Sequence, residues 1–301
     1  MVNLMKVVNP VVGFLLKFYG LSAQTVEIEP GTVIHFWKPA RIIKNKKKYR
    51  QTKPALVLLH GFGATGVLTW LFQIAAFSKK YAVFVPDLLF FGGSTTDSTD
   101  RSPAFQADCL AKALKLLGVE SCAVVGCSYG GIVGSKMALL DPKLVKCLVL
   151  SNSNLALTES HSEVAFERVG ITSWPELLLP DTVEGLKKLL RVIVYKRPWF
   201  PNWAYKHFLE VMFDSRKERA ELLNALVIKE CEFIIPNFLQ KVYIMAGEED
   251  KLFNLEIVQK TKEQLGEKAT LYYIKKAGHI AHVERPFVYN RLLKDILKAS
   301  L

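Results

Sequence analysis

A serine at position 128 lies in a pattern that suits a nucleophile. Residues 126–130 read Gly-Cys-Ser-Tyr-Gly, which is the G-x-S-x-G sequence of a nucleophile elbow. An apolar run at 122–125 predicts a buried strand before the motif, and residues 132–140 predict a helix after it. The chain must then reverse within one residue, so the backbone is strained and the hydroxyl exposed, while the glycines avoid clashes. This context predicts that Ser128 is the nucleophile and that Cys127 packs away from it.

A serine nucleophile requires a base that takes its proton and an acid that orients the base. The last predicted strand, 271–274, is followed by a loop that ends in His279, which we predict to be the base. The predicted strand 241–246 runs into the turn Gly-Glu-Glu-Asp, whose last residue, Asp250, we predict to be the acid. The three residues then follow the order serine, carboxylate, histidine.

Other residues compete for these two roles. Glu248 and Glu249 precede Asp250 in the same turn, and His282 lies three residues beyond His279. These three are the less favoured alternatives for the acid and the base. The remaining histidines are expected to be structural: His35, His60, His161 and His207.

Attack on a carbonyl creates an oxyanion, which needs hydrogen-bond donors held in place. The segment His-Gly-Phe-Gly at 60–63 follows the apolar run 55–59 and predicts a loop that supplies one donor, the N–H of Phe62. The residue after the nucleophile supplies the other donor, the N–H of Tyr129. We therefore predict an oxyanion hole formed by the Phe62 and Tyr129 amides.

Taken together, these motifs make the chain resemble an α/β-hydrolase from about residue 25 to its end. The matching segments are His60-Gly61-Phe62-Gly63 with Trp70, then 86–94, 126–131, 247–250 and 278–286. Within that superfamily the chain resembles a group of plant hydrolases related to esterases, monoacylglycerol lipases and carbon–carbon hydrolases of meta-cleavage products. The resemblance implies a doubly wound α/β fold with a mostly parallel eight-stranded sheet. The alternation of predicted strands and helices favours the same fold class.

The resemblance leaves more than one activity open. We expect a serine hydrolase that cleaves a carboxylic ester of a small or medium apolar compound through an acyl-enzyme. A carbon–carbon hydrolase with the same triad and a plant-hormone-type receptor with slow hydrolase activity are the alternatives. Epoxide hydrolases and haloalkane dehalogenases of this fold place an Asp where this chain has Ser128, which argues against that branch. A second acid position used in such folds follows the strand 146–151, and there the chain has Asn152 and no carboxylate.

Strand signals stop between residues 151 and 241, which predicts a helical insertion in the sheet domain. We therefore divide the chain into an N-terminal helix or extension at 1–24, a core at 25–154 and 237–301, and a helical cap at 155–236. The helices expected in the cap are 163–168, 183–195, 203–213 and 216–228.

A cap of this kind covers the nucleophile, and it is rich in aromatic side chains. We expect these side chains to line an apolar pocket together with core residues near the oxyanion loop. The predicted pocket residues are Phe90, Phe91, Trp174, Trp199, Phe208 and Met212.

The composition agrees with one globular enzyme, because 301 residues with 50% hydrophobic content can bury a large core. The five cysteines are scattered and form no C-x-x-C pair or Cys/His cluster, so we expect no disulfide, no metal and no cofactor. Free cysteines favour a reducing compartment, which predicts a cytoplasmic protein with possible access to the nucleus.

The net charge of +12 is dispersed and matches no nucleic-acid-binding motif, so we expect no nucleic-acid partner. The basic run at 41–50 is expected to be a solvated loop, with weak attraction to an anionic membrane as the alternative. The apolar stretch at 1–19 is too short to span a bilayer and is expected to pack on the body, with an interfacial helix as the alternative. We expect a monomer or weak homodimer whose partner is a small apolar ester.

Overall fold

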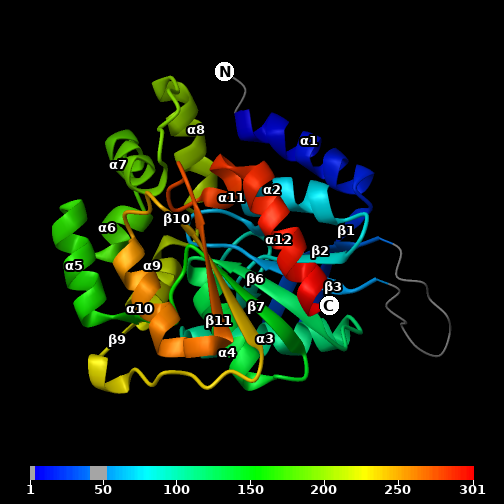
Figure 1. Cartoon of the computed structure of the whole chain (residues 1–301). Helices are drawn as coiled ribbons and strands as arrows, with labels where there is room; N and C mark the ends of the chain where they lie inside the picture. Colours follow the sequence, from blue (N-terminus) through cyan, green and yellow to red (C-terminus); the bar gives the residue numbers. More distant parts are fainter. Residues whose placement is uncertain (1–3, 41–52) are drawn as a thin grey trace.

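The computed structural model describes residues 4–40 and 53–301 and is built around one mixed, mostly parallel sheet (Figure 1). Eight strands follow the order β1, β2, β4, β3, β6, β7, β10, β11, and a short β5 pairs with β2 beside this path. The pairs from β4 to β11 are parallel, whereas β2 is antiparallel to β1 and β4. The predicted fold class is therefore confirmed. The strands are β1 (Leu21–Glu29), β2 (Thr32–Pro39), β3 (Ala55–Leu59), β4 (Ala82–Pro86), β5 (Thr95–Thr96), β6 (Cys122–Cys127), β7 (Val145–Ser151), β10 (Lys241–Gly247) and β11 (Ala269–Ile274).

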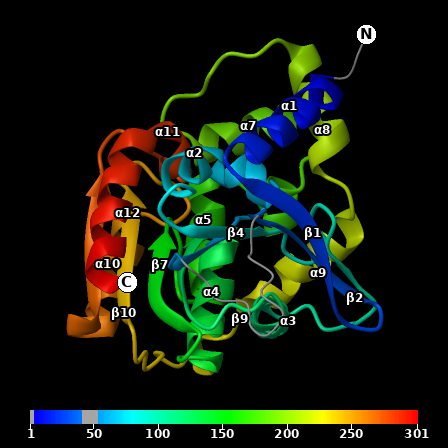
Figure 2. The ribbon, with the colours of Figure 1, turned by 90° about the vertical axis from the view of Figure 1, so that its right-hand side faces the viewer.

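The central strands are continuous apolar runs because helices cover both faces of the sheet. Every residue of β3, β4 and β6 is buried. Helices α3, α4 and α10 pack on one face, and α2 and α12 pack on the other with the shorter α11, as Figures 1 and 2 show. The bounds are α2 (Gly66–Phe77), α3 (Pro103–Leu116), α4 (Tyr129–Leu140), α10 (Leu255–Leu265), α11 (Ala281–Glu284) and α12 (Pro286–Ser300), with a 3₁₀ turn η2 (Gly266–Lys268).

A helical region is inserted between β7 and β10, as expected. It contains α5 (Glu159–Val169), α6 (Trp174–Leu178), α7 (Val183–Ile193), α8 (Asn202–Met212), α9 (Arg216–Leu226) and the 3₁₀ turn η1 (Glu230–Glu232). The sequence did not indicate the two-residue strands β8 (Leu157–Thr158) and β9 (Val227–Ile228), which pair with each other. This small parallel pair joins the beginning of the insertion to its end, so both connections leave the core at nearly the same place.

The chain begins its described part with helix α1 (Leu4–Phe18), which packs against β1 and lies beside α8 (Figure 1). Strand β1 starts at Leu21, so the sheet begins before the predicted domain boundary at residue 25. Within the part of the chain that the structure describes, no helix is long and apolar enough to cross a membrane. The basic run at 41–50 lies outside the described residues.

Candidate active site

Ser128 lies at the tight turn between β6 and α4, as predicted. Its backbone has φ 52° and ψ −121°, a strained conformation for a residue with a side chain. A Cβ atom on Gly126 would overlap the carbonyl of Gly130, and one on Gly130 would come within 2.6 Å of the Leu59 carbonyl oxygen. A Cβ on Gly131 would overlap the side chain of Ser153 beyond β7. The glycines are therefore required because the elbow is packed directly against neighbouring backbone.

The side chains predicted as base and acid are hydrogen-bonded to each other. His279 Nδ1 lies 2.9 Å from Asp250 Oδ2, and both side chains are buried. The other carboxylate oxygen accepts hydrogen bonds from the backbone N–H groups of Leu252 at 2.8 Å and Phe253 at 3.1 Å. Because a carboxylate can only accept, Nδ1 donates, and Nε2 is the ring nitrogen left to accept a proton.

The competing acids and base are not part of this pair. Glu249 is exposed and Glu248 is half-buried, and neither contacts the His279 ring among the described residues. His282 is buried against the ring of Trp70, with 4.6 Å between ring centroids, and its two ring nitrogens have no hydrogen-bond partner in the described part of the chain. Burial lowers the pKa of His282 to about 3, mainly because the charged form is desolvated. His282 therefore serves as a neutral packing residue.

Asn152 is a member of the site that the sequence reasoning missed. It follows β7, with φ 45°, and its amide donates to Asp250 Oδ2 at 3.0 Å and to the carbonyl of Gly278 at 3.2 Å. The amide thus fixes the carboxylate and the loop that carries His279 at the same time. The available signal was its location, because the sequence had marked this strand end as an alternative acid position.

The two predicted oxyanion donors are not used elsewhere. Within the described residues, the backbone N–H groups of Phe62 and Tyr129 donate to no other group. A Cβ on Gly61 would lie 3.2 Å from the Ser128 Cβ, so this loop passes directly over the elbow. The Phe62 ring packs edge-on against Tyr129, with 5.7 Å between centroids. The loop geometry thus leaves both amides available beside the serine.

His60 holds the oxyanion loop in place. Its Nδ1 bonds the carbonyl of Gly61 at 2.8 Å, and its Nε2 accepts from the Leu88 N–H at 2.9 Å. Burial lowers the pKa of His60, which agrees with a neutral ring that donates at one nitrogen and accepts at the other. The structural role expected for His60 is therefore consistent with its contacts.

The Ser128 hydroxyl makes no hydrogen bond to any described residue, His279 included. Catalytic hydrogen bonds are often long in the absence of a substrate and tighten when it binds. The structure thus shows the acid–base pair assembled and the serine separate from it.

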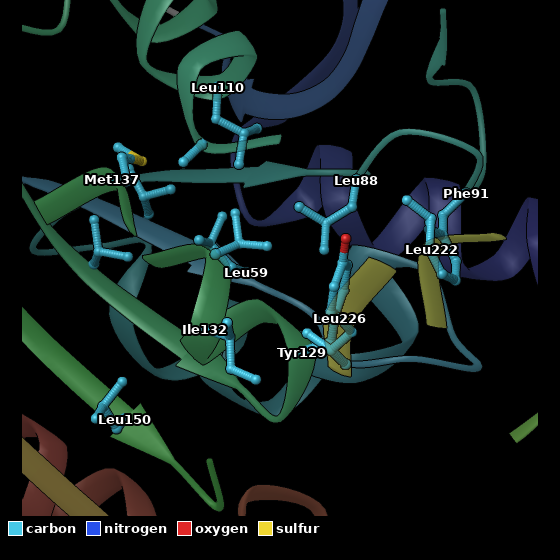
Figure 3. Packing of buried hydrophobic residues seen from close by; sticks show 14 of the residues in the cluster. Leu59, Leu88, Phe91, Leu110, Tyr129, Ile132, Met137, Leu150, Leu222 and Leu226 are labelled. Carbon is cyan, nitrogen blue, oxygen red and sulfur yellow. The ribbon is translucent and has the colours of Figure 1, made fainter. Parts of the chain in front are cut away.

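Ser128 opens onto a small apolar cavity of about 30 Å³ under the cap. Such a volume holds roughly two water molecules and is too small for an ester group with its substituents. Figure 3 shows Leu222 and Leu226 of α9 reaching to the cluster of core residues that includes Phe91 and Tyr129. The other lining residues are Phe62, Tyr129, Ile132, Leu157, Trp174, Leu178, Leu223, Leu226, Leu252 and Phe253.

Of the pocket residues predicted from the cap, Trp174 lines this cavity and Trp199 does not. The Trp199 prediction was wrong: the side chain is 83% exposed on the loop between α7 and α8 and is not among the residues that line the cavity. Aromatic content indicated a cap but not which side of it faces the serine.

Four other predicted pocket residues lie outside this lining. The Phe91 ring packs against the Phe62 ring, with 5.1 Å between ring centroids. The Phe90 carbonyl accepts a hydrogen bond from the buried Arg219. The Met212 carbonyl also accepts a hydrogen bond from Arg219, and Phe208 lines a second cavity within the cap. These residues pack against the oxyanion loop or within the cap and do not line the cavity at Ser128.

Comparisons with known proteins agree with this architecture. A family model described as the alpha/beta hydrolase fold matches residues 54–179. The chain is 26% identical to lipase 3 of Moraxella sp. over 238 residues, which cover 77% of this chain and 74% of the lipase. It is 27% identical to a 2-hydroxy-6-oxononadienedioate/2-hydroxy-6-oxononatrienedioate hydrolase of Burkholderia vietnamiensis, with 81% and 87% covered. It is 22% identical to human epoxide hydrolase 4, with 82% and 73% covered.

Solved structures show the same likeness at the level of the fold. A bacterial membrane phospholipase A superposes with a TM-score of 0.79 at 22% identity, covering 99% of this chain and 91% of that one. A meta-cleavage product hydrolase of Pseudomonas fluorescens superposes with a TM-score of 0.72 at 20% identity, covering 92% and 98%. The protein therefore has the α/β-hydrolase fold, and its sequence relatives include a lipase and a 2-hydroxy-6-oxononadienedioate/2-hydroxy-6-oxononatrienedioate hydrolase.

Proposed function

We propose that this protein is a serine hydrolase that cleaves carboxylic esters through an acyl-enzyme. The observation that carries the proposal is the 2.9 Å contact between His279 Nδ1 and the buried Asp250, in a fold that presents Ser128 at a strained elbow. Asp250 holds the imidazole in the tautomer that can accept a proton at Nε2. In this proposal Ser128 is the nucleophile, His279 is the base and Asp250 is the orienting acid.

In the proposed reaction Ser128 Oγ attacks the ester carbonyl while His279 Nε2 takes the hydroxyl proton. The Phe62 and Tyr129 amides donate to the developing oxyanion. The tetrahedral intermediate collapses to the acyl-enzyme, and His279 returns the proton to the departing alkoxide, which leaves as an alcohol. A water molecule then repeats the sequence on the acyl-enzyme, and this second half releases the acid and restores Ser128.

The lining of the Ser128 cavity supports an apolar substrate. Among the described residues that line it, none carries a charge. A carbon–carbon hydrolase acting on a dienoic acid would need a cation for the substrate carboxylate, so the lining favours an ester of an apolar acid. Since the cavity has only about 30 Å³, binding also requires Trp174, Leu223 or Leu226 of the cap to move away from the serine.

A series of p-nitrophenyl esters from acetate to laurate tests the proposal, with Ser128→Ala as the matched control. We expect ester hydrolysis by the wild type and background rates for the variant, with a preference among chain lengths set by the cap. If no ester is hydrolysed faster by the wild type than by Ser128→Ala, the proposal is contradicted. Slow single turnover with retention of the acyl group would instead favour the receptor alternative.

A further inference from the structure

Helix α1 carries a stripe of apolar side chains that does not face the body of the protein. Val11, Phe14 and Phe18 recur at every third or fourth position and therefore share one side of the helix. Phe14 is 71% exposed and Phe18 is 76% exposed, whereas Leu16 on the opposite side is buried. Over residues 11–18, one side of this helix therefore packs on the core, and the other side presents phenylalanine rings to the surroundings.

A second exposed apolar group comes from the loop between α7 and α8 and from the first turn of α8. Residues 198–201 read Pro-Trp-Phe-Pro, so two aromatic side chains are presented between prolines that restrict the backbone. Trp199 is almost fully exposed, and Phe200 and Trp203 are each about half exposed. Tryptophan and phenylalanine rings exposed to water carry an unfavourable solvation free energy, which is relieved when a lipid or a protein covers them.

The elements that carry the two groups lie at one end of the molecule. Helices α1 and α8 contact each other, and both lie at the top of Figures 1 and 2. The loop before α8 is held toward the same end because the Tyr195 N–H donates to Glu284 of α11 at 2.7 Å. We call the six apolar residues on this end the docking face: Val11, Phe14, Phe18, Trp199, Phe200 and Trp203.

The two chain segments that carry the docking face are basic. Lys17 on α1 and Lys196, Arg197 and Lys206 near the cap loop are exposed. The sequence has no acidic residue from 4 to 18 and none from 195 to 209. Aromatic side chains surrounded by Lys and Arg are the combination that binds the headgroup region of an anionic bilayer, because rings enter the interface while cations meet phosphates and carboxylates.

We propose that the docking face binds the surface of an anionic lipid bilayer without crossing it. An apolar cavity of about 200 Å³ in the cap favours lipid over a protein partner, because Phe200 belongs to both the cavity and the docking face. The remaining walls of the cavity come from α7 and α8 and include Leu186, Leu190 and Phe208. A lipid acyl chain can enter this apolar cavity, whereas a flat protein surface would not fill it. Binding to lipid does not depend on the proposed ester hydrolysis.

Co-sedimentation with phosphatidylcholine vesicles, with and without phosphatidylserine, tests this proposal. We expect the wild type to pellet with the anionic vesicles, less with phosphatidylcholine alone, and less again at high salt. The triple variant Phe14→Ala, Phe18→Ala, Trp199→Ala should weaken binding by about tenfold or more. Ser128→Ala should bind as well as the wild type, so that membrane binding and hydrolysis can fail separately.

A matched control replaces two equally exposed apolar residues elsewhere on the chain. Ile234 is 83% exposed and Leu239 is 78% exposed, in the segment between η1 and β10 at the opposite end of the molecule in Figure 1. The double variant Ile234→Ala, Leu239→Ala should bind vesicles like the wild type. Equal binding by the triple variant and the wild type, or no binding of the wild type to either vesicle, would overturn the proposal. A dimer in sedimentation velocity that the triple variant abolishes, without vesicle binding, would assign the face to a second copy and also overturn it.

Discussion

Asn152 donates its side-chain amide to Asp250 at 3.0 Å, and it does so at the carboxylate oxygen that also meets His279. One oxygen therefore receives two donors from two different strand ends, β7 and β11, while the other oxygen receives backbone N–H groups. The carboxylate is held from four directions. In the proposed mechanism Asn152 is a positioning residue, because it acts on the acid and does not touch the substrate.

Two variants of Asn152 separate this role from a purely structural one. Asn152→Gly keeps the positive φ of 45° without strain and removes the amide, so turnover should fall by about tenfold while KM stays nearly constant. Asn152→Asp places a second carboxylate beside Asp250, so turnover should fall further and recover partly at lower pH. Steady-state kinetics across pH checks both. Unchanged turnover in both variants, with the fold intact by circular dichroism, would show that the amide has no part in catalysis.

Two substitutions of Phe62 test the oxyanion loop. Phe62→Pro removes the backbone N–H, and the loss of one oxyanion donor costs roughly 3 kcal/mol, or a hundred- to thousandfold in turnover. Phe62→Ala keeps the N–H and trims the ring that packs on Tyr129, so it should keep most turnover and shift the preference among acyl groups. A folded proline variant with the turnover of the wild type would transfer the donor role to another amide, first that of Gly63.

His282 makes folding dependent on pH. Its pKa is lowered from 6.5 to about 3 in the folded protein, so the unfolded chain binds a proton between these values that the folded chain cannot. The free energy of unfolding should therefore decrease as pH falls through this window, by at most ~1.4 kcal/mol per pH unit from this residue. His282→Phe should reduce that slope, measured by urea unfolding at several pH values from about pH 7 to about pH 4. The same slope in both proteins would mean that His282 gains a proton in the folded state.

Arg219 of α9 joins the cap to the core. Its guanidinium is buried, donates to the carbonyls of Phe90 at 2.9 Å and Met212 at 2.7 Å, pairs with Asp214, and lies 4.2 Å above the Phe91 ring. Arg219→Met leaves buried carbonyls without a donor and should lower the free energy of unfolding by about 2–4 kcal/mol.

An exposed arginine on the cap provides the control for this prediction. Among the described residues, the Arg168 guanidinium makes one hydrogen bond, to the Lys251 carbonyl at 3.3 Å, so Arg168→Met should cost less than about 1 kcal/mol. Equal losses in the two variants would show that the buried contacts of Arg219 contribute little to holding the cap on the core.

The elements of the site that the sequence could predict are those attached to a strand end. Ser128, Asp250, His279 and Phe62 each follow an apolar run by a few residues, and carboxyl ends of parallel strands meet at one edge of a sheet. The spacing of glycines identified the elbow because only a residue without Cβ fits against the Leu59 and Gly130 backbone. The motifs in the sequence and the topology of the sheet therefore both place the site at the carboxyl ends of the parallel strands.

What the sequence could not predict depends on packing between distant segments. Trp174 and Trp199 both lie in the cap as aromatic residues beside a proline, yet one lines the cavity at Ser128 and the other is exposed. The direction of each ring depends on how the cap helices are oriented on the core. Residue type alone does not predict that orientation. Asn152 was missed for a similar reason, because an amide gains significance only once Asp250 is known to lie beside it. The strands β8 and β9 have two residues each, too few to show a period.

The central claim is that Ser128 is a nucleophile activated by His279 and Asp250, and covalent labelling measures it most directly. Treatment with a fluorophosphonate, followed by peptide mass spectrometry, should place one phosphonate adduct on Ser128. Ser128→Ala should take up no label, and His279→Ala and Asp250→Asn should label much more slowly, since triad knockouts cost up to roughly a millionfold in turnover. Labelling of the Ser128→Ala variant at the wild-type rate, or an adduct on another residue of the wild type, would contradict the account.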